Sequence, residues 1–341
     1  KVLLGSYGFD EVYSSIYILW FTFIGPIEVA ERTTSWLLNS ASQSSWIKYP
    51  ENSLVITSHG AKKRNWIEYL QLKNHYIFDN VEPNPSIDIT TSIINEFNST
   101  NFATIIGVGG GSCLDVAKFV AAKLNKKKIL VPTTFGSGSD LTRISVLKVD
   151  GKKRSFHDDS LFADVSITDS NFLLNTPDQI KKNSAIDACA QCSEAFDSKS
   201  GNKHTKFLCK IAFENLENGI ISNNDDQLVF GSMLSGLGFG NCSTTLGHAL
   251  SYVFSNEGIS HGHALAYTTT IAHEFNNSEF YERFLKIVKK LGFSKIKLKQ
   301  DVEKAASMIL EDKKHLDNNP KPVTKNDIVK LLESINSQNE L

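Results

Sequence analysis

Four polar residues in the second half of the chain could together hold a metal ion. Asp187 and Gln191 stand four residues apart in the helical stretch "DACAQCSEAF", so they share one helix face. His248 and His261 follow on two later predicted helices. Carboxylate and imidazole groups are common ligands of divalent transition metals. Helical spacing alone leaves two interpretations open: a metal cage, or ordinary polar side chains of core and surface.

A glycine-rich turn in the first half could bind a phosphate group. The segment "IIGVGGGSCLDVAK" (105–118) leads from an apolar strand into a helix. Glycine lets the backbone approach a ligand closely, and the amides at a helix start attract a pyrophosphate. The turn comprises Gly109, Gly110, Gly111 and Ser112. We expect a dinucleotide site, although the spacing is not G-x-G-x-x-G; a turn that needs glycine only for its shape is the alternative.

A second loop follows the next predicted strand. The stretch "VPTTFGSGSDLT" (131–142) places the hydroxyl groups of Thr133 and Thr134 before two flexible glycines. Alone, it could be a plain loop. Because it arrives one strand after the glycine turn, we expect it beside the same ligand.

The tip of an early strand bears on the choice of cofactor. An acidic residue there usually holds the adenosine ribose of a dinucleotide. The stretch "LVITSHGAKKR" (54–64) offers Ser58 instead, followed by Lys62, Lys63 and Arg64. A tip without the carboxylate and with three cations should tolerate a 2′-phosphate, so NADP(H) is favoured over NAD(H). A solvated basic helix start is the alternative for any one of these lysines.

The elements that must position these residues change character midway. Short β-rich apolar runs alternate with helical patterns, which predicts a parallel sheet covered by helices. The predicted strands are 53–57, 75–78, 103–111, 127–134 and 164–168. After Thr176–Pro177 only helical patterns follow, at 180–197, 203–216, 226–240, 244–254, 262–274, 280–291, 300–313 and 325–336. We therefore expect an α/β domain over 1–176 and a helical domain over 177–341, with the ligand cleft between them.

The composition excludes several classes of partner. The chain has 341 residues, with 36 Lys and Arg against 37 Asp and Glu, so no net charge favours nucleic acid or an anionic membrane. The apolar run "IYILWFTFI" (16–24) is shorter than the ~20 residues of a membrane span and is expected as a buried strand. Five cysteines within apolar segments indicate reduced thiols and a cytoplasmic protein.

Five motifs together resemble the iron-containing alcohol dehydrogenase family. They are "GVGGGSCLDVAK", "PTTFGSGSDLT", "DACAQCSEAF", "LGHALSY" and "ISHGHALA", in the family's order and spacing from about residue 50 onward. The resemblance implies a Rossmann-like α/β domain followed by an all-α domain, the dehydroquinate synthase-like architecture. It also implies an enzyme that reduces aldehydes or oxidises alcohols with NAD(P).

Metal ligands can be carried over from this resemblance residue by residue. Asp187, His248 and His261 match three of the family's four ligands, which hold a divalent metal such as iron or zinc. The fourth is normally histidine, and here it is Gln191. Because an amide oxygen is a weaker ligand than imidazole, we expect looser metal binding, or three protein ligands with more water.

The resemblance also assigns cofactor and proton-transfer positions. The matching cofactor residues are Gly109, Gly110, Gly111, Ser112, Asp115, Lys118, Thr133 and Thr134. Tyr252 stands where the family often has a second histidine, and Tyr252, His263 or a water molecule could deliver the proton. Glu194 continues the Asp187 helix face and is expected to support the ligands. Cys189 and Cys192 are expected to be core residues rather than zinc ligands.

The variants "HALSY" and "ISHGHA" resemble the branch that reduces phosphonoacetaldehyde to 2-hydroxyethylphosphonate. The expected activity is reduction of a small aldehyde to a primary alcohol by a homodimer. A polyol oxidoreductase like glycerol dehydrogenase is one alternative, and a catalytically silent binding relative is another. A lyase like dehydroquinate synthase is disfavoured, since "FGSGSDLTRISV" lacks the lysine-bearing glycine pattern of such enzymes.

Overall fold

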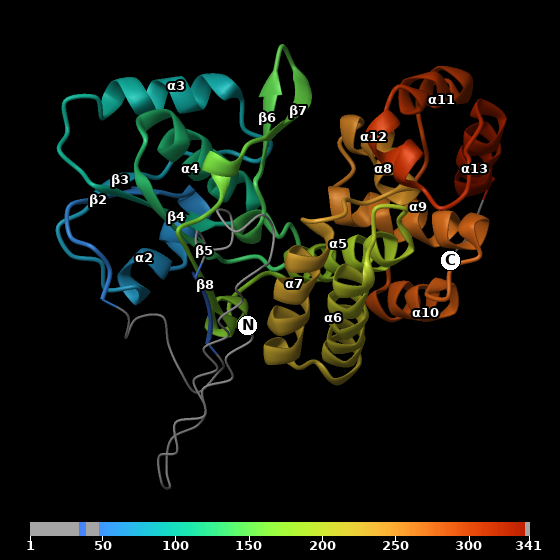
Figure 1. Cartoon of the computed structure of the whole chain (residues 1–341), viewed down its shortest axis with the longest axis horizontal. Helices are drawn as coiled ribbons and strands as arrows, with labels where there is room; N and C mark the ends of the chain where they lie inside the picture. The colour runs from blue at the N-terminus through green and yellow to red at the C-terminus, as the bar shows by residue number, and fades with distance from the viewer. Residues whose placement is uncertain (1–33, 39–47, 338–341) are drawn as a thin grey trace, which may run out of the picture. The chain divides into compact units, whose positions relative to one another are not determined.

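The computed structural model describes residues 34–38 and 48–337, which fall into two compact units (Figure 1). The first unit comprises the described residues up to Thr134 together with Ser139–Thr176. The second comprises Phe135–Gly138 and the described residues from Pro177 onward. The stretch 16–24, predicted as a buried strand, lies outside the described residues.

The first unit is built on a six-stranded sheet in which all neighbouring strands are parallel. The strand order is β1-β8-β5-β4-β2-β3. The strands are β1 (Thr34–Leu38), β2 (Ser53–Ile56), β3 (Tyr76–Phe78), β4 (Thr104–Gly109), β5 (Lys127–Pro132) and β8 (Val165–Asp169). Five of these coincide with the predicted apolar runs, and β1 was not predicted. The parallel α/β architecture is therefore confirmed.

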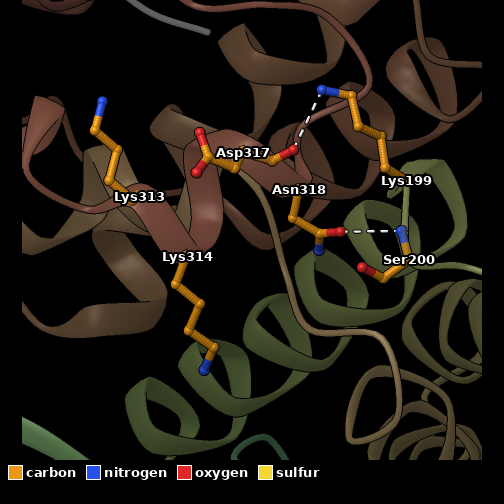
Figure 2. Close-up of a pocket in the computed structure, with 6 residues that line it drawn as sticks. All are labelled: Lys199, Ser200, Lys313, Lys314, Asp317 and Asn318. Atoms are coloured by element: carbon orange, nitrogen blue, oxygen red, sulfur yellow. Dashed lines mark hydrogen bonds between the residues drawn. The ribbon is translucent and has the colours of Figure 1, made fainter.

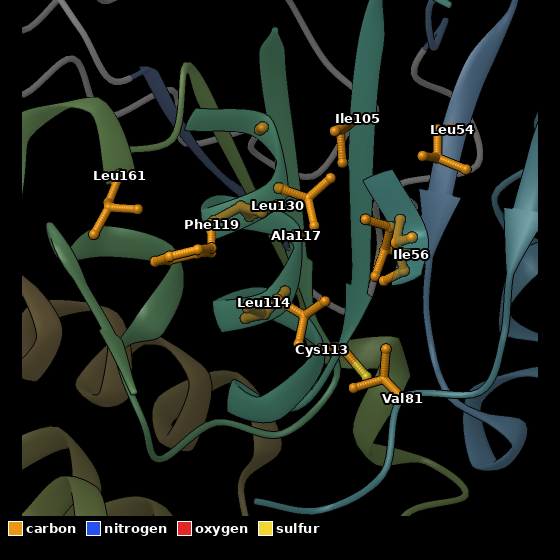
Figure 3. Close-up of a cluster of buried hydrophobic side chains, with 14 of the residues drawn as sticks. Leu54, Ile56, Val81, Ile105, Cys113, Leu114, Ala117, Phe119, Leu130 and Leu161 are labelled. Carbon is orange, nitrogen blue, oxygen red and sulfur yellow. The ribbon is translucent and has the colours of Figure 1, made fainter. Parts of the chain in front are cut away.

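Helix α4 (Gly111–Leu124) forms the centre of this unit's core. It packs against β4 and β5 and is buried along most of its length. Leu114 and Ala117 of α4 lie in one apolar cluster with Leu54, Ile56 and Ile105 of the strands (Figure 3). The other α-helices are α1 (His59–Lys63), α2 (Trp66–Tyr69) and α3 (Ile87–Glu96). Burial of α4 fixes its first turn against the end of β4.

An antiparallel hairpin was missed by the sequence analysis. Strands β6 (Ile144–Val149) and β7 (Lys152–His157) pair with each other and not with the main sheet. The sequence of β7, "KKRSFH", is mostly exposed and lacks the apolar alternation that identifies a half-buried strand. Short 3-10 helices lie at Ser139–Leu141, Asp159–Leu161 and Ser170–Leu173.

The described part of the second unit contains helices and no strands, which confirms its predicted class. The helices are α5 (Asp178–Asp197), α6 (Lys203–Ser222), α7 (Asp225–Phe239), α8 (Leu246–Asn256), α9 (His261–Asn276), α10 (Tyr281–Leu291), α11 (Val302–Leu310), α12 (Lys313–Asn318) and α13 (Lys325–Ser337). Helix α5 packs against α6, α7 and α9, and small side chains such as Ala188 and Ala190 permit this close approach.

The predicted helix 300–313 ends early, and a short helix that was not predicted begins at its last residue. Helix α11 ends at Leu310, and Asp312 caps α12 by accepting a hydrogen bond from the His315 backbone N–H at 3.4 Å. An aspartate at this position satisfies an amide that would otherwise lack a partner. Exposed residues of α12 line a surface hollow with Lys199 and Ser200 (Figure 2).

Two further expectations concern the whole chain. Among the described residues, no helix combines the length and apolar character needed to cross a membrane. The cysteines are all free and buried, at positions 113, 189, 192, 209 and 242. Cys189 and Cys192 lie inside the helical core, where they were expected.

Candidate metal and cofactor sites

Three helices of the second unit bring Asp187, His248 and His261 together. Asp187 lies in the middle of α5, His248 in the first turn of α8, and His261 is the first residue of α9. Their ligand atoms all lie within 4.8 Å of one another. Oδ1 of Asp187 is 3.8 Å from Nε2 of His248 and 3.9 Å from Nε2 of His261. We call these residues the ligand cluster; one carboxylate and two imidazoles suit a divalent transition metal.

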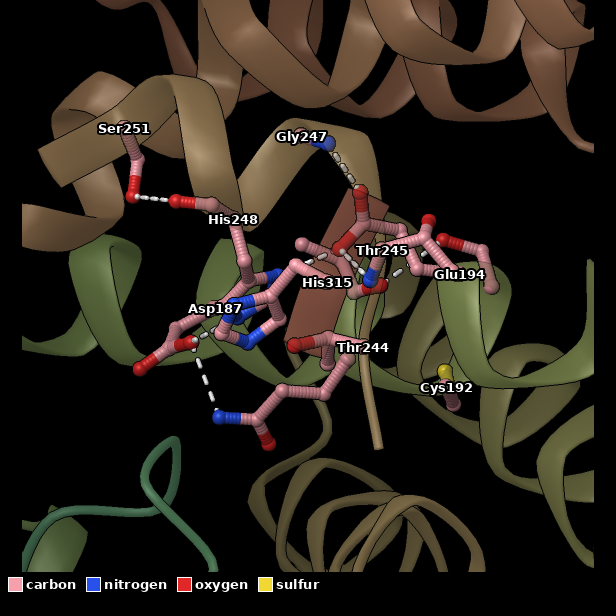
Figure 4. Close-up of polar contacts among 12 residues, drawn as sticks. Asp187, Cys192, Glu194, Thr244, Thr245, Gly247, His248, Ser251 and His315 are labelled. Atoms are coloured by element: carbon pink, nitrogen blue, oxygen red, sulfur yellow. Dashed lines mark hydrogen bonds and ion pairs between the residues drawn. The ribbon is translucent and has the colours of Figure 1, made fainter. Parts of the chain in front are cut away.

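Glu194, two turns along α5 from Asp187, supports His248 from behind. Its carboxylate contacts Nδ1 of His248 and accepts hydrogen bonds from the backbone N–H groups of Thr245 and Gly247 (Figure 4). Burial favours the neutral form of His248, but Glu194 and Asp187 raise its pKa to about 9. With Nδ1 held by Glu194, Nε2 is the nitrogen that faces Asp187. Glu194 therefore lies in the supporting position predicted for it.

Gln191 lies beside the ligand cluster but uses its nitrogen there. Its Nε2 donates a hydrogen bond to Oδ1 of Asp187 at 2.9 Å. Its Oε1 is buried and accepts no hydrogen bond from the described residues. A buried polar atom without a partner is unusual and costly, so a bound ion or water at Oε1 would fit the site. The donor set and this carbonyl oxygen both agree with the implied metal.

The two candidates for proton delivery lie in different surroundings. The Tyr252 ring stacks on His261, with centroids 6.2 Å apart and planes 12° apart. Burial raises the pKa of the Tyr252 phenol. His263 instead directs Nε2 to the carbonyl oxygen of Ser294 at 2.5 Å, and its ring packs on Phe293. Of the two, Tyr252 is the one that contacts a member of the ligand cluster.

Sequence reasoning missed a histidine–aspartate pair, His315 and Asp312, beside this cluster. His315 lies 6.4 Å from His248 between ring centroids, and its Nδ1 contacts Oδ2 of Asp312 at 2.7 Å. The only sequence signal was an aspartate three residues before a histidine, which is common at helix starts. No local pattern indicates that α12 packs against α8.

The glycine turn (109–112) joins β4 to α4 in the first unit. The N-cap residue Gly110 has no side chain to cap the first amides of α4. A Cβ added at Gly110 would lie 2.9 Å from Oγ1 of Thr134, and the Thr133 N–H donates to the carbonyl oxygen of Gly109 at 3.0 Å. The second loop thus lies against the turn. Uncapped amides beside a small-residue surface fit a pyrophosphate.

Asp115 and Lys118 face the protein interior below this turn. Asp115 accepts hydrogen bonds from Ser139 Oγ at 2.6 Å and from the Val146 N–H at 3.1 Å. Lys118 Nζ donates to the carbonyl oxygens of Ser139 and Ile144 and lies 3.3 Å from Asp115. In the structure, therefore, this pair holds the end of the second loop and the start of β6.

The predicted basic tip is partly neutralised within the first unit. Ser58 caps α1 and accepts a hydrogen bond from the Ala61 N–H at 3.4 Å. Lys62 pairs with Asp79 at 2.7 Å, and Arg64 lies 4.0 Å from the Trp66 ring centroid. Asp79 follows β3, a position that the sequence analysis did not consider.

Two family models together match most of the chain, and both describe the same family. Residues 42–170 match the family model described as iron-containing alcohol dehydrogenase. Residues 181–309 match the C-terminal model of the Fe-containing alcohol dehydrogenase family. The two matches cover the glycine turn and the ligand cluster.

Curated relatives are dehydrogenases and reductases. 4-Hydroxybutyrate dehydrogenase of Clostridium kluyveri is 32% identical over 209 residues, which is 53% of this chain and 56% of that protein. Sulfoacetaldehyde reductase of Bilophila wadsworthia is 26% identical over 313 residues, which is 73% of this chain and 81% of that protein. The match to long-chain-alcohol dehydrogenase 1 of Geobacillus thermodenitrificans also spans 56% of that protein, so this chain aligns with little more than half of two of these relatives.

Solved structures share the fold at low identity. Sulfoacetaldehyde reductase from Bifidobacterium kashiwanohense, in complex with NAD+, has a TM-score of 0.83 and 19% identity, covering 91% of this chain and 98% of that one. An iron-containing alcohol dehydrogenase from Thermotoga maritima has a TM-score of 0.79 and 22% identity, covering 94% and 100%. At these identities the likeness shows the fold alone.

Proposed function

Because this chain belongs to the iron-containing alcohol dehydrogenase family, a family of oxidoreductases, we propose that it is a metal-dependent NAD(P)H oxidoreductase that reduces a small aldehyde to a primary alcohol. The observation that carries the proposal is the convergence of Asp187, His248 and His261 from three separate helices. Polar residues that converge in this way, with His248 buried and the other two partly buried, indicate a site rather than a solvated surface.

The metal would be held by Asp187, His248 and His261, and we propose iron. A divalent metal held there would supply Lewis-acid stabilisation of negative charge on a carbonyl oxygen, typically worth several kcal/mol. Glu194 holds the Nδ1 side of His248 and so keeps Nε2 for the cluster. Gln191 keeps its hydrogen bond to Asp187 and orients that carboxylate, with its Oε1 as a weaker fourth donor.

Tyr252 is our choice to supply the proton that an alcohol product requires. The reduction consumes one hydride from the nicotinamide and one proton. A tyrosine phenol is protonated at neutral pH, so its hydroxyl has a proton to donate. Its ring contact with His261 supports a place beside the reacting group. His263 is disfavoured, since its Nε2 is engaged by the Ser294 carbonyl.

The cofactor would lie with its pyrophosphate at the glycine turn. A preference for NADP(H) is supported by Ser58 in place of a carboxylate and by the exposed Lys63. Lys62 contributes less than the sequence indicated, because Asp79 neutralises it. Changing Lys63 to Ala should weaken binding of NADPH more than of NADH, measured by nucleotide fluorescence. Changing Asp79 to Asn should strengthen NADPH binding, and equal changes for both nucleotides would refute the preference.

For the substrate we propose an aldehyde that carries an acidic group, with phosphonoacetaldehyde as the specific candidate. The names of two relatives, 4-hydroxybutyrate dehydrogenase and sulfoacetaldehyde reductase, denote an alcohol and an aldehyde that each carry an acidic group. The alternative is a polyol, as for glycerol dehydrogenase. We further propose a homodimer in the cytoplasm; the free, buried thiols support a reducing compartment, and light scattering tests the dimer.

The experiment is turnover by the purified chain with NADPH or NADH against phosphonoacetaldehyde, sulfoacetaldehyde and simple aldehydes, and with NADP+ or NAD+ against glycerol. Each is measured with iron, zinc, manganese or no added metal. We expect metal-dependent oxidation of NADPH with an acidic aldehyde. Turnover of glycerol alone would support the polyol alternative. A protein that binds neither metal nor nucleotide would support the silent relative.

A further inference from the structure

Four aromatic rings at the ligand cluster contact one another in a closed cycle. Ring centroids lie 5.5 Å apart for His248 and His261, 6.2 Å for His261 and Tyr252, 5.9 Å for Tyr252 and His315, and 6.4 Å for His315 and His248. We call these residues the four-ring cluster. Two of its members belong to the ligand cluster, and the other two lie against them.

Each ligand imidazole has a nearly parallel ring beside it. The planes of His315 and His248 differ by 15°, and those of Tyr252 and His261 by 12°. Stacked rings at these separations attract each other and resist rotation about the side-chain bonds. The orientation of His248 is therefore constrained by Glu194 at one nitrogen and by His315 across its face.

His315 is itself fixed by Asp312. The contact between Nδ1 of His315 and Oδ2 of Asp312 is 2.7 Å, while Oδ1 of Asp312 caps α12. The His315 side chain is buried beside His248 (Figure 4). One carboxylate thus sets both the start of α12 and the position of the ring that α12 carries.

We propose that His315, held by Asp312, is a positioning residue that keeps the imidazole of His248 in the orientation needed for metal binding. This inference rests on the proposed function. His315 is not assigned as a ligand, since its Nδ1 is engaged by Asp312 and it does not join the group of ligand atoms within 4.8 Å. Its action is through the face of its ring.

The substitution at position 191 explains why such support matters in this chain. Gln191 gives Asp187 a hydrogen bond rather than giving the site a third imidazole. With fewer strong donors, each remaining ligand must be well oriented for the same affinity. The His315 stack and the Glu194 contact act on the same ligand, His248, from different sides.

The test compares His315→Ala with His315→Phe in the full chain. The probe is Co²⁺, followed by its absorption bands and by competition with a chelator. We expect His315→Ala to weaken binding about 10- to 100-fold, as the loss of outer support typically does. His315→Phe keeps the stacked ring but loses the contact with Asp312, so its loss should be close to that of Asp312→Asn and clearly smaller than that of His315→Ala.

Two further variants separate positioning from folding. Asp312→Asn keeps a residue that caps helices well but removes one carboxylate acceptor, so an intermediate loss of affinity is expected. Lys313→Ala, on the exposed side of α12 beside the surface hollow of Figure 2, is the matched control and should bind Co²⁺ like the wild type. Thermal melting of each variant shows whether the fold is kept.

The outcomes are distinct. If His315→Ala binds Co²⁺ as tightly as the wild type, or if His315→Phe loses as much as His315→Ala, the positioning role is refuted and the proposed function stands. If the wild type itself binds no metal, the proposed function and this inference both fall. Rescue by phenylalanine alone supports the inference.

Discussion

The glycine turn and the ligand cluster are built in opposite ways. The turn is made of consecutive residues at the end of β4 and the start of α4, and it presents backbone amides. The ligand cluster takes one side chain from each of α5, α8 and α9, and each depends on packed neighbours. A change in the turn should therefore act locally, whereas the cluster should be sensitive to residues that never contact the metal.

Removal of a ligand should give the largest effect and should leave the other region intact. Asp187→Ala deletes the carboxylate whose Oδ1 faces both imidazoles. We expect loss of metal binding and a fall in kcat of at least about 10³-fold, since several kcal/mol of charge stabilisation is lost. Binding of NADPH, measured by fluorescence, should not change. Turnover at the wild-type rate would contradict the assignment.

Loss of the support behind His248 should have the next largest effect. Glu194→Gln removes the charge that contacts Nδ1 of His248. Metal affinity should fall about 10- to 100-fold while some activity returns at high metal concentration. Chelator competition measures the affinity. An unchanged affinity would mean that the ligand cluster, like the glycine turn, does not depend on neighbouring side chains.

A smaller and purely local effect is expected at the turn. In Gly110→Ala the added Cβ would lie 2.9 Å from Thr134 Oγ1, so the Thr134 side chain must shift. We expect about tenfold weaker binding of NADPH, equivalent to about 1.4 kcal/mol, with metal affinity unchanged. A parallel loss of metal affinity in this variant would show that the two regions are coupled.

The last prediction concerns stability instead of binding, at Asp197 at the C-terminal end of α5 and the buried His273 of α9. His273 Nδ1 lies 3.7 Å from Asp197 Oδ2, and His273 Nε2 contacts Ser193 Oγ at 2.8 Å. Burial lowers the pKa of His273 from 6.5 to about 4, so the unfolded chain binds more protons between these values and stability rises with pH. Burial raises the pKa of Asp197 from 3.8 to about 6, so in that window stability falls with pH. The two trends oppose each other.

Asp197→Asn should therefore leave the effect of His273 on the pH dependence of stability unopposed. Between pH 4 and 6 the free energy of unfolding of the variant should rise with pH more steeply than that of the wild type, by about 2 kcal/mol over the window. Urea unfolding at a series of pH values measures this difference. Identical slopes would mean that the two groups do not titrate as a buried pair.

The same contrast explains what the sequence could predict. Strands β2, β4 and β5 and the glycine turn were recognisable because each is encoded by neighbouring residues. Asp187, His248 and His261 were recognisable as candidate ligands by their residue types. Of the residues that hold His248 in place, only Glu194 was indicated by the sequence. His315 and Asp312 were missed because packing between α12 and α8 has no local signal. The β6–β7 hairpin was missed because its exposed, charged strand lacks an apolar period.

The pairing of neighbouring strands also weakens the prediction that the basic tip binds a 2′-phosphate. Lys62 looked available from its sequence context, yet Asp79 after β3 lies 2.7 Å from it. The two residues meet because β2 and β3 are adjacent and parallel, so their ends lie at the same edge of the sheet. A single charged residue on a neighbouring strand is enough to weaken a prediction of cofactor choice.

The most direct test of the account is anomalous diffraction at the iron edge from crystals of the chain loaded with Fe²⁺ under reducing conditions. We predict one dominant peak at about 2.0–2.2 Å from a carboxylate oxygen of Asp187 and from Nε2 of His248 and His261. A fully active protein with no peak among these three side chains would contradict the account.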